Sequence, residues 1–164
     1  SDSAWDTTDG LAGSEYLEFV HGRVEGQPAL DLDLEVRVQT VCRDAVRAGL
    51  VASAHDLSDG GMATALAECA IIGNIGASVT ESPDAGGRWD AAMFGEAQSR
   101  ILLSVSPDNL DRIKALAHDH DVPLAVIGLV GGDALSFGDN CSVLLSDASD
   151  AWKNGFSRAT SDRD

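Results

Sequence analysis

The stretch HDLSDGGMATALAECAIIG at residues 55–73 decides the fold, because it leads out of a strand and into a helix through two adjacent glycines. The short apolar run at 50–55 predicts the strand. Apolar side chains then recur at helical spacing through 62–72, and Gly73 ends the predicted helix. A strand followed at once by a helix predicts a domain in which helices pack on a sheet.

The turn at 58–61 is open to two interpretations. Gly60 and Gly61 permit a tight turn and a close backbone approach, and the free N–H groups at a helix start attract a phosphate or a carboxylate. In the alternative, Ser58 or Asp59 only caps the helix and the glycines only turn the chain. Because carboxylates flank the turn, an anion there would need Mg²⁺ or a basic group from another domain.

Helical and strand patterns alternate along the rest of the chain. This order predicts an α/β (α+β) fold, with one mixed β-sheet and helices packed on it. The expected segments are helix 33–48, strand 75–80, a helical turn within 89–98, strand 100–106, helix 108–118, strands 123–130, 134–137 and 142–145, and a helix from 147.

The domain boundaries follow from the same patterns. Residues 1–30 have mixed polarity and several turn signals, so we expect a linker and N-terminal extension with a short ordered stretch at 15–21. Residues 31–158 form the predicted domain, and 159–164 form a tail.

The composition excludes some partners. The 164 residues carry 27 acidic and 11 basic side chains, which gives a net charge of −16. Nucleic acids and membrane surfaces require clustered Lys and Arg, which this sequence lacks, so neither is expected as a partner. The carboxylates are spread through nearly every loop, and we interpret them as the surface adaptation of a salt-adapted organism, where high ionic strength screens self-repulsion.

The three cysteines predict neither a disulfide framework nor a metal site. They are odd in number and far apart, and Cys42 and Cys69 fall on apolar faces of predicted helices. We therefore expect inert thiols in a reducing compartment, which points to the cytoplasm. The sequence contains no complete set of catalytic residues and no metal-ligand spacing.

A second polar cluster lies in the sequence FGEAQSR at residues 94–100. Arg100 is able to hold an oxyanion with two parallel N–H donors. In the alternative, Arg100 forms an ion pair with Glu96 or Asp90 at a strand edge. Spacing alone does not choose between these two roles.

These motifs resemble a known family. The sequence HDLSDGGMATALAE at 55–68 is similar to the C-terminal domain of the aminoimidazole ribonucleotide synthetase superfamily, and within it to the phosphoribosylformylglycinamidine synthase family. The sequences GSEY at 13–16, FGEAQSR at 94–100, and Ile127-Gly128 leading to 131–133 agree with this resemblance. The similarity runs from about residue 10 to residue 158.

The resemblance implies an ATP-dependent C–N ligase of purine biosynthesis. Formylglycinamide ribonucleotide, glutamine-derived ammonia and ATP would give formylglycinamidine ribonucleotide, ADP and phosphate. It implies ATP and Mg²⁺ as cofactors of the full-length enzyme, with N-terminal synthetase domains and a glutaminase domain or subunit as partners. Because those N-terminal domains carry the general base and most ATP ligands, we expect the isolated chain to be inactive. A thiamine-phosphate kinase and a hydrogenase maturation protein are alternatives from the same superfamily.

The resemblance also indicates ligand-binding residues. The family's Glu-Ser-Gln motif reads Glu96-Ala97-Gln98 here, so the hydroxyl donor of that motif is missing. In an alternative role, the domain is a non-catalytic scaffold whose site has lost its ligand. The candidate ligand or phosphate-binding residues are Ser58, Asp59, Gly60, Gly61, Glu96, Gln98 and Arg100.

Overall fold

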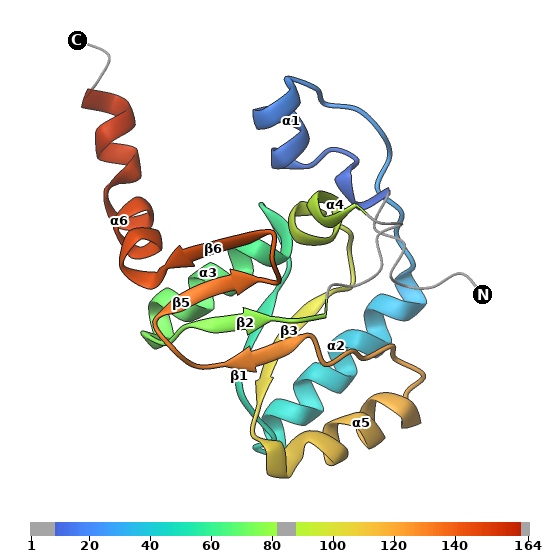
Figure 1. Ribbon diagram of the computed structural model, residues 1–164. Coiled ribbons are helices and arrows are strands. Elements are labelled where there is room, and N and C mark those ends of the chain that lie inside the picture. The colour runs from blue at the N-terminus through green and yellow to red at the C-terminus, as the bar shows by residue number, and fades with distance from the viewer. Residues whose placement is uncertain (1–8, 82–87, 162–164) are drawn as a thin grey trace. The chain divides into compact units, whose positions relative to one another are not determined.

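The computed structural model of the chain describes residues 9–81 and 88–161, and it contains both helices and strands (Figure 1). Residues 1–8 of the expected N-terminal extension, 82–87 of the expected loop and 162–164 of the expected tail lie outside the described residues. The elements are η1 Asp9–Leu11, α1 Glu15–His21, α2 Leu32–Arg47, β1 Val51–Asp56, α3 Gly61–Gly73, β2 Ala77–Val79, α4 Trp89–Phe94, β3 Ile101–Val105, η2 Pro107–Asn109, α5 Leu110–Asp119, β4 Gly128–Val130, β5 Ala134–Phe137, β6 Cys141–Leu144 and α6 Leu145–Ser161.

The described residues form two compact units. Of these residues, 9–65 and 88–126 belong to the first unit, and 66–81 and 127–161 belong to the second. Helix α3 begins in the first unit and ends in the second. All seven candidate ligand residues belong to the first unit.

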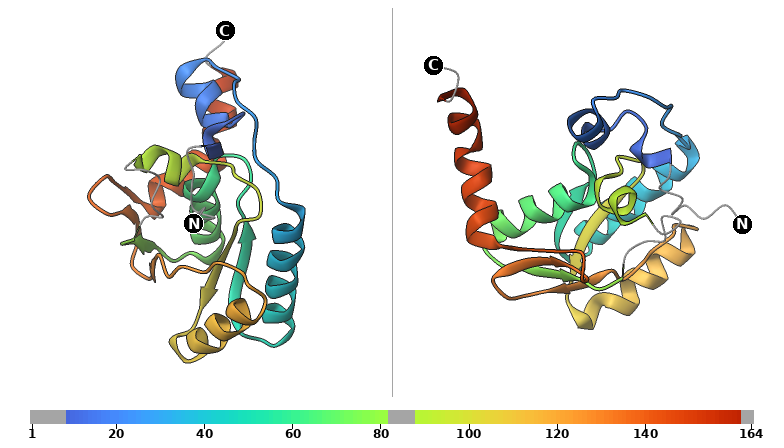
Figure 2. Two further views of the ribbon diagram at one scale, coloured as in Figure 1. Left: turned by 90° about the vertical axis from the view of Figure 1, so that its right-hand side faces the viewer. Right: turned by 45° about the horizontal axis from the view of Figure 1, so that its top comes forward.

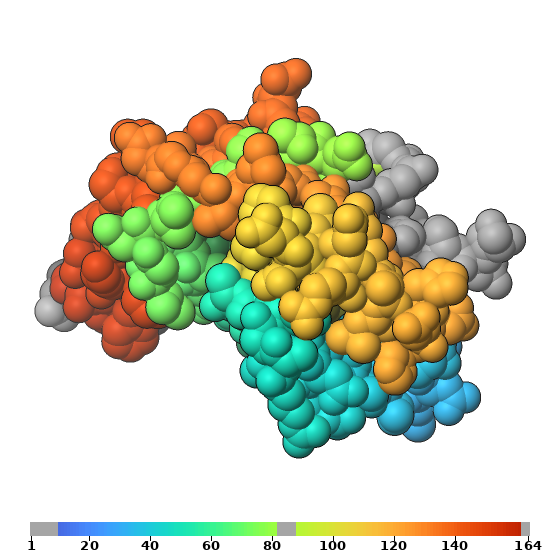
Figure 3. Space-filling view, turned by 90° about the horizontal axis from the view of Figure 1, so that it is seen from below, coloured from blue at the N-terminus to red at the C-terminus, as the bar shows by residue number. Residues whose placement is uncertain are grey.

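The first unit is built on the antiparallel strands β1 and β3, with Asp56 opposite Ile101. Helix α2 runs alongside β1 (Figure 2, left panel). The outer surfaces of α2 and α5 adjoin in Figure 3, where they are cyan and yellow to orange. A small core holds the strands and helices together, and its buried members are Ala45, Leu50 and Ile113.

Helix α2 shows how local sequence sets an element. The Asp31 carboxylate caps the helix by accepting a hydrogen bond from the Leu34 backbone N–H at 3.0 Å. Val38, Val41 and Ala45 recur at spacings of three and four and are all buried, as an amphipathic helix requires. The expected helix at 33–48 is therefore confirmed within one residue at each end.

The second unit contains a four-stranded sheet in the order β4-β2-β5-β6 (Figure 1). Strand β2 pairs antiparallel with β4 and parallel with β5, and β5 pairs antiparallel with β6. Helix α6 begins at the residue after β6. Its first residue, Leu145, is held against the sheet unit, since its N–H donates to the Asp133 carbonyl at 2.9 Å and its side chain is buried.

The predicted fold class is confirmed, but the single sheet was wrong. The described strands divide into the β1–β3 pair and the four-stranded sheet. A strand pattern records which face is buried, whereas pairing depends on partners that are far away in sequence.

The expected strand at 123–130 was also too long. Strand β4 takes in only Gly128–Val130, although the Ile127 carbonyl also accepts hydrogen bonds from the N–H groups of Thr80 and Glu81. Pro123 has no N–H to donate, and Leu124 and Val126 are 36% and 44% exposed. The apolar run that predicted a buried strand is therefore mainly an exposed segment in this chain.

Candidate functional site

The turn between β1 and α3 has the geometry that its two glycines allow. Gly60 and Gly61 have φ of +79° and +65°, in the left-handed region that favours glycine. The Gly61 N–H donates to the Ser58 carbonyl at 2.9 Å, which closes the turn. The Leu57 N–H donates to the Arg100 carbonyl at 3.0 Å, so the turn starts directly beside the second predicted cluster.

The backbone of Gly61 touches the loop that follows α4. A Cβ atom added at Gly61 would lie 2.6 Å from the Gly95 carbonyl oxygen and 2.8 Å from the Phe94 carbonyl carbon. No side chain fits between two backbones this close. The tertiary structure therefore brings together the two sequence motifs at 55–61 and 94–100.

Glu96 joins the turn to a third segment. Its Oε1 atom accepts one hydrogen bond from the Gly60 N–H at 2.8 Å and another from the Glu15 N–H at 3.0 Å. A carboxylate beside a helix start is favourable, because the backbone N–H groups there carry partial positive charge. An anion does contact this turn, and it is the protein's own side chain.

These contacts bear on the two alternatives for the turn, which are an anion-binding site and a simple helix cap by Ser58 or Asp59. The Gly60 and Gly61 N–H groups already have acceptors in Glu96 and Ser58. The side chains of Ser58 and Asp59 make no hydrogen bond to the start of α3 among the described residues. The simple capping role of these two side chains is therefore not what the structure shows.

Arg100 is the second feature of the site. Its Nη1 donates to the Gly95 carbonyl at 3.2 Å, and burial lowers the pKa of the guanidinium from its ordinary value. Neither predicted ion pair forms, because Glu96 contacts backbone amides and Asp90 pairs with Arg88 at 2.6 Å. Within 9–81 and 88–161, Arg100 has no carboxylate partner.

The remaining predicted residues lie at the surface. Gln98 is exposed, and its Nε2 makes a long hydrogen bond of 3.5 Å to the Glu96 carbonyl. Ser58 and Asp59 are also exposed. Sequence reasoning missed Ser99, which has φ of +63° and a buried hydroxyl without a partner in the described part of the chain. A serine in this conformation leaves no signal in the sequence, since glycine or asparagine is the usual residue there.

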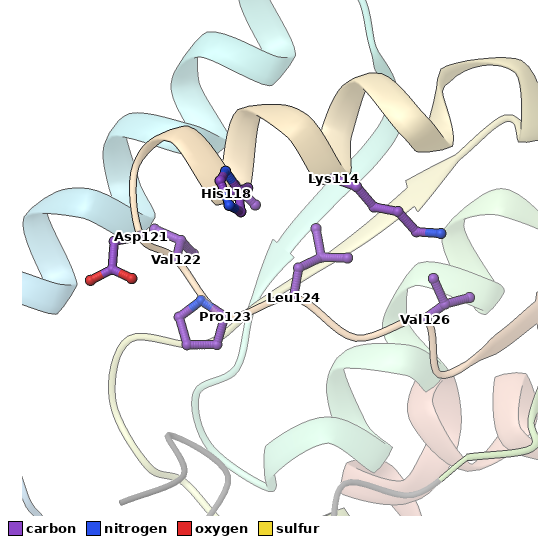
Figure 4. A pocket seen from close by; sticks show the side chains of 8 residues that line it. Lys114, His118, Asp121, Val122, Pro123, Leu124 and Val126 are labelled. Atoms are coloured by element: carbon purple, nitrogen blue, oxygen red, sulfur yellow. The ribbon is translucent and has the colours of Figure 1, made fainter. Parts of the chain in front are cut away.

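A separate hollow of about 460 Å³ lies between α5 and the segment that follows it. Figure 4 shows Lys114 and His118 projecting from α5 and Leu124 pointing toward the helix from the opposite side. The hollow is lined by none of the candidate ligand residues, so it does not belong to the site at the glycine turn.

The remaining features of the chain are possible metal-ligand clusters, the three cysteines and possible membrane-spanning helices. Among the described residues, no three His, Cys, Asp or Glu side chains gather closely enough to hold a metal ion. Cys42 and Cys69 are half-buried, and burial raises the pKa of both thiols, whereas Cys141 is exposed. No helix in the described part of the chain has the length and apolar character to cross a bilayer.

Comparisons with known proteins agree with the sequence motifs. Residues 3–138 match the family described as AIR synthase related protein, C-terminal domain. The phosphoribosylformylglycinamidine synthase subunit PurL of Anaeromyxobacter sp. is 43% identical over 154 residues. That match covers 88% of this chain but 20% of the relative, so the chain spans about a fifth of the relative's length.

Solved structures show the same fold. The structure of PurLQS from Thermotoga maritima, and that of T. maritima PurL complexed with ATP, each match with a TM-score of 0.67 at 22% identity. Each match covers 84% of this chain and 24% of the solved chain. Because the family match covers most of the chain, the chain belongs to the family of AIR synthase related C-terminal domains.

Proposed function

We propose that the chain is the C-terminal domain of a phosphoribosylformylglycinamidine synthase, an ATP-dependent ligase of purine biosynthesis in the cytoplasm. The whole protein converts formylglycinamide ribonucleotide, ammonia from glutamine and ATP into formylglycinamidine ribonucleotide, ADP and phosphate. The named relative, 43% identical over most of this chain, supports this reaction over the kinase and hydrogenase-maturation branches. The family resemblance supplies the partners, which are N-terminal synthetase domains and a glutaminase.

The observation that carries a ligand-binding role is the state of Arg100. A guanidinium has five N–H donors, and one of them is engaged within the described residues. A half-buried cation with no carboxylate partner among the described residues contributes little to stability, because desolvation opposes its burial. Arg100 therefore suits a phosphate oxygen of a ligand, and we assign it this contact together with Gln98 and the exposed Ser58.

The cofactors divide between this domain and the rest of the protein. ATP supplies the phosphoryl group whose release drives the amidation, and Arg100 fits an oxygen of such a phosphate. The family resemblance assigns most of the Mg²⁺–ATP ligands to the N-terminal domains, so we assign Mg²⁺ to those domains. Gly60, Gly61 and Glu96 shape the turn beside this proposed ligand site, and Asp59 is exposed next to it.

A scaffold role is the second candidate, and one contact favours it. Glu96 occupies the Gly60 N–H that a bound phosphate would otherwise use, and its carboxylate repels phosphate. The departure at Ala97 from the family's Glu-Ser-Gln motif points in the same direction. In this role the domain supports the fold and the contacts of the whole protein without binding a ligand.

The proposed reaction is tested by comparing this chain with the longer protein that carries it. The longer protein is expected to release ADP only when formylglycinamide ribonucleotide and ammonia are both present, whereas this chain alone releases none. Coupled measurement of ADP at saturating ATP makes the comparison. Release of ADP by the longer protein that does not depend on formylglycinamide ribonucleotide would contradict the proposal.

We also propose that the acidic surface is an adaptation to salt. At a net charge of −16, repulsion within the fold weakens as the Debye length falls from about 10 Å at 0.1 M to about 3 Å at 1 M salt. We expect the melting temperature of the chain to rise by about 3 °C between 0.1 M and 2 M KCl, which corresponds to roughly 1 kcal/mol for a chain of 164 residues. Scanning calorimetry measures this change, and a melting temperature that falls with added salt would refute the adaptation.

A further inference from the structure

We propose that Glu96 is a positioning residue that couples the N-terminal segment 9–21 to the turn at Gly60 and Gly61. A single carboxylate oxygen accepts the N–H of Gly60, 36 residues before Glu96, and the N–H of Glu15, 81 residues before it. Movement of the segment that carries Glu15 therefore changes the support of the Gly60 peptide. This coupling is independent of any ligand. Only its effect on the proposed ligand site at the turn rests on the proposed function.

The backbone of Glu96 is held by the same segment as its side chain. The Glu96 N–H donates to the Gly10 carbonyl at 2.7 Å. A Cβ atom at Gly10 would lie 3.3 Å from the Ala97 Cβ, so η1 packs directly against the residue after Glu96. The carboxylate is thus fixed relative to η1 before it reaches the two amides.

The N-terminal segment is itself anchored on the first unit. Leu11 is buried and Ser14 is 2% exposed, and the Ser14 hydroxyl donates to the Leu11 carbonyl at 2.8 Å. The Tyr16 ring stacks on Phe94 with ring centroids 4.8 Å apart. These contacts make the segment part of the structure that shapes the turn, whether or not it also serves as a linker in the longer protein.

The coupling has a consequence for the whole protein. The Glu96 carboxylate stabilises the turn, because a partly buried Gly60 N–H without an acceptor is unfavourable. The segment 9–21 shares that acceptor, so a force on the segment from the rest of the protein reaches the turn. Glu96 thereby links the position of the N-terminal segment to the geometry of the turn at the proposed ligand site.

Two substitutions at position 15 isolate the shared hydrogen bond. Glu15→Pro removes the N–H that Glu96 accepts, and it suits the first position of α1, where proline is favoured. Ser14 already has φ of −76° and ψ of 152°, the extended conformation that a following proline requires. Glu15→Ala keeps the N–H and serves as the matched control.

Amide hydrogen exchange of Gly60, followed by NMR on the ¹⁵N-labelled chain, measures the coupling. We expect Glu15→Pro to speed Gly60 exchange about fivefold and Glu15→Ala to leave it within twofold. Glu96→Ala is expected to speed it at least about tenfold, whereas Glu96→Gln, which keeps an acceptor oxygen, stays near the unsubstituted chain. Exchange of the Ile113 amide, in the core, reports any general unfolding.

The outcome that overturns the coupling is equal Gly60 exchange in Glu15→Pro and Glu15→Ala. If Glu96→Ala does not fold, the two variants at position 15 still decide the matter. Titration of the same labelled chain with inorganic phosphate tests the proposed function separately, because a shift of Arg100 side-chain resonances requires no change at Gly60. Absence of phosphate binding therefore counts against the ligand role and leaves the coupling standing on its exchange data.

Discussion

Replacing Gly61 by alanine is expected to lower the free energy of unfolding by about 4 kcal/mol or more, close to the exceptional range for a single substitution. Two causes act together at this position. The left-handed backbone at φ +65° costs a residue with a Cβ about 1–2 kcal/mol. The added Cβ would also lie 2.6 Å from the Gly95 carbonyl oxygen, and neither backbone is free to rotate away.

Gly49→Ala provides the matched control for this prediction. Gly49 has the same φ of +65°, but no atom lies within 4 Å of an added Cβ. We expect it to lose only the conformational part, about 1–2 kcal/mol. Urea unfolding curves of both variants give the two free energies. Equal losses of unfolding free energy in the two variants would contradict the close backbone contact between Gly61 and the loop at 94–95.

Replacing Arg100 by methionine in the longer protein is expected to lower kcat/KM for the amidation about 100-fold, as for other groups that hold a developing or transferred anion. Stability should change by about 1 kcal/mol or less, because removing a half-buried guanidinium that has no carboxylate partner among the described residues also removes its desolvation penalty. The initial rate of ADP release gives kcat/KM, and urea unfolding of this chain gives the stability. The combination separates a contact with ligand from a contact that only supports the fold.

Arg112→Met is the control for Arg100→Met. Arg112 is exposed on α5 and makes one long hydrogen bond to Asn109 at 3.4 Å. We expect its loss to leave kcat/KM within about twofold, as for surface positions away from a site. An unchanged rate in Arg100→Met, at unchanged stability, would contradict the ligand role and favour the scaffold role.

The local elements were predictable from the sequence because they depend on neighbours along the chain. Gly73 ends α3 and the ordered stretch at 15–21 is α1, as their side chains and spacing predict. The two glycines at 60–61 predicted a tight turn, and their positive φ values confirm it. The resemblance to the family rested on such short contiguous motifs, and the comparisons confirm that family.

Long-range pairing was not predictable from the same patterns. The apolar run at 123–130 predicts a buried strand, but its first part, at 123–126, pairs with no strand among the described residues and is exposed. Likewise, the spacing of Arg100 from Glu96 and Asp90 allowed an ion pair that neither carboxylate makes. Spacing along the sequence limits which side chains are able to form an ion pair. Which pairs form depends on the other partners that the fold brings close to each side chain.

The sequence by itself determined the family, the strand–turn–helix at 55–73 and the residues that gather near it. Only the tertiary structure decided what those residues contact. Glu96 became a positioning residue because folding brings amides from 36 and 81 residues away to one carboxylate oxygen. Within the described residues Arg100 has no carboxylate partner, since Glu96 accepts hydrogen bonds from backbone amides and Asp90 pairs with Arg88.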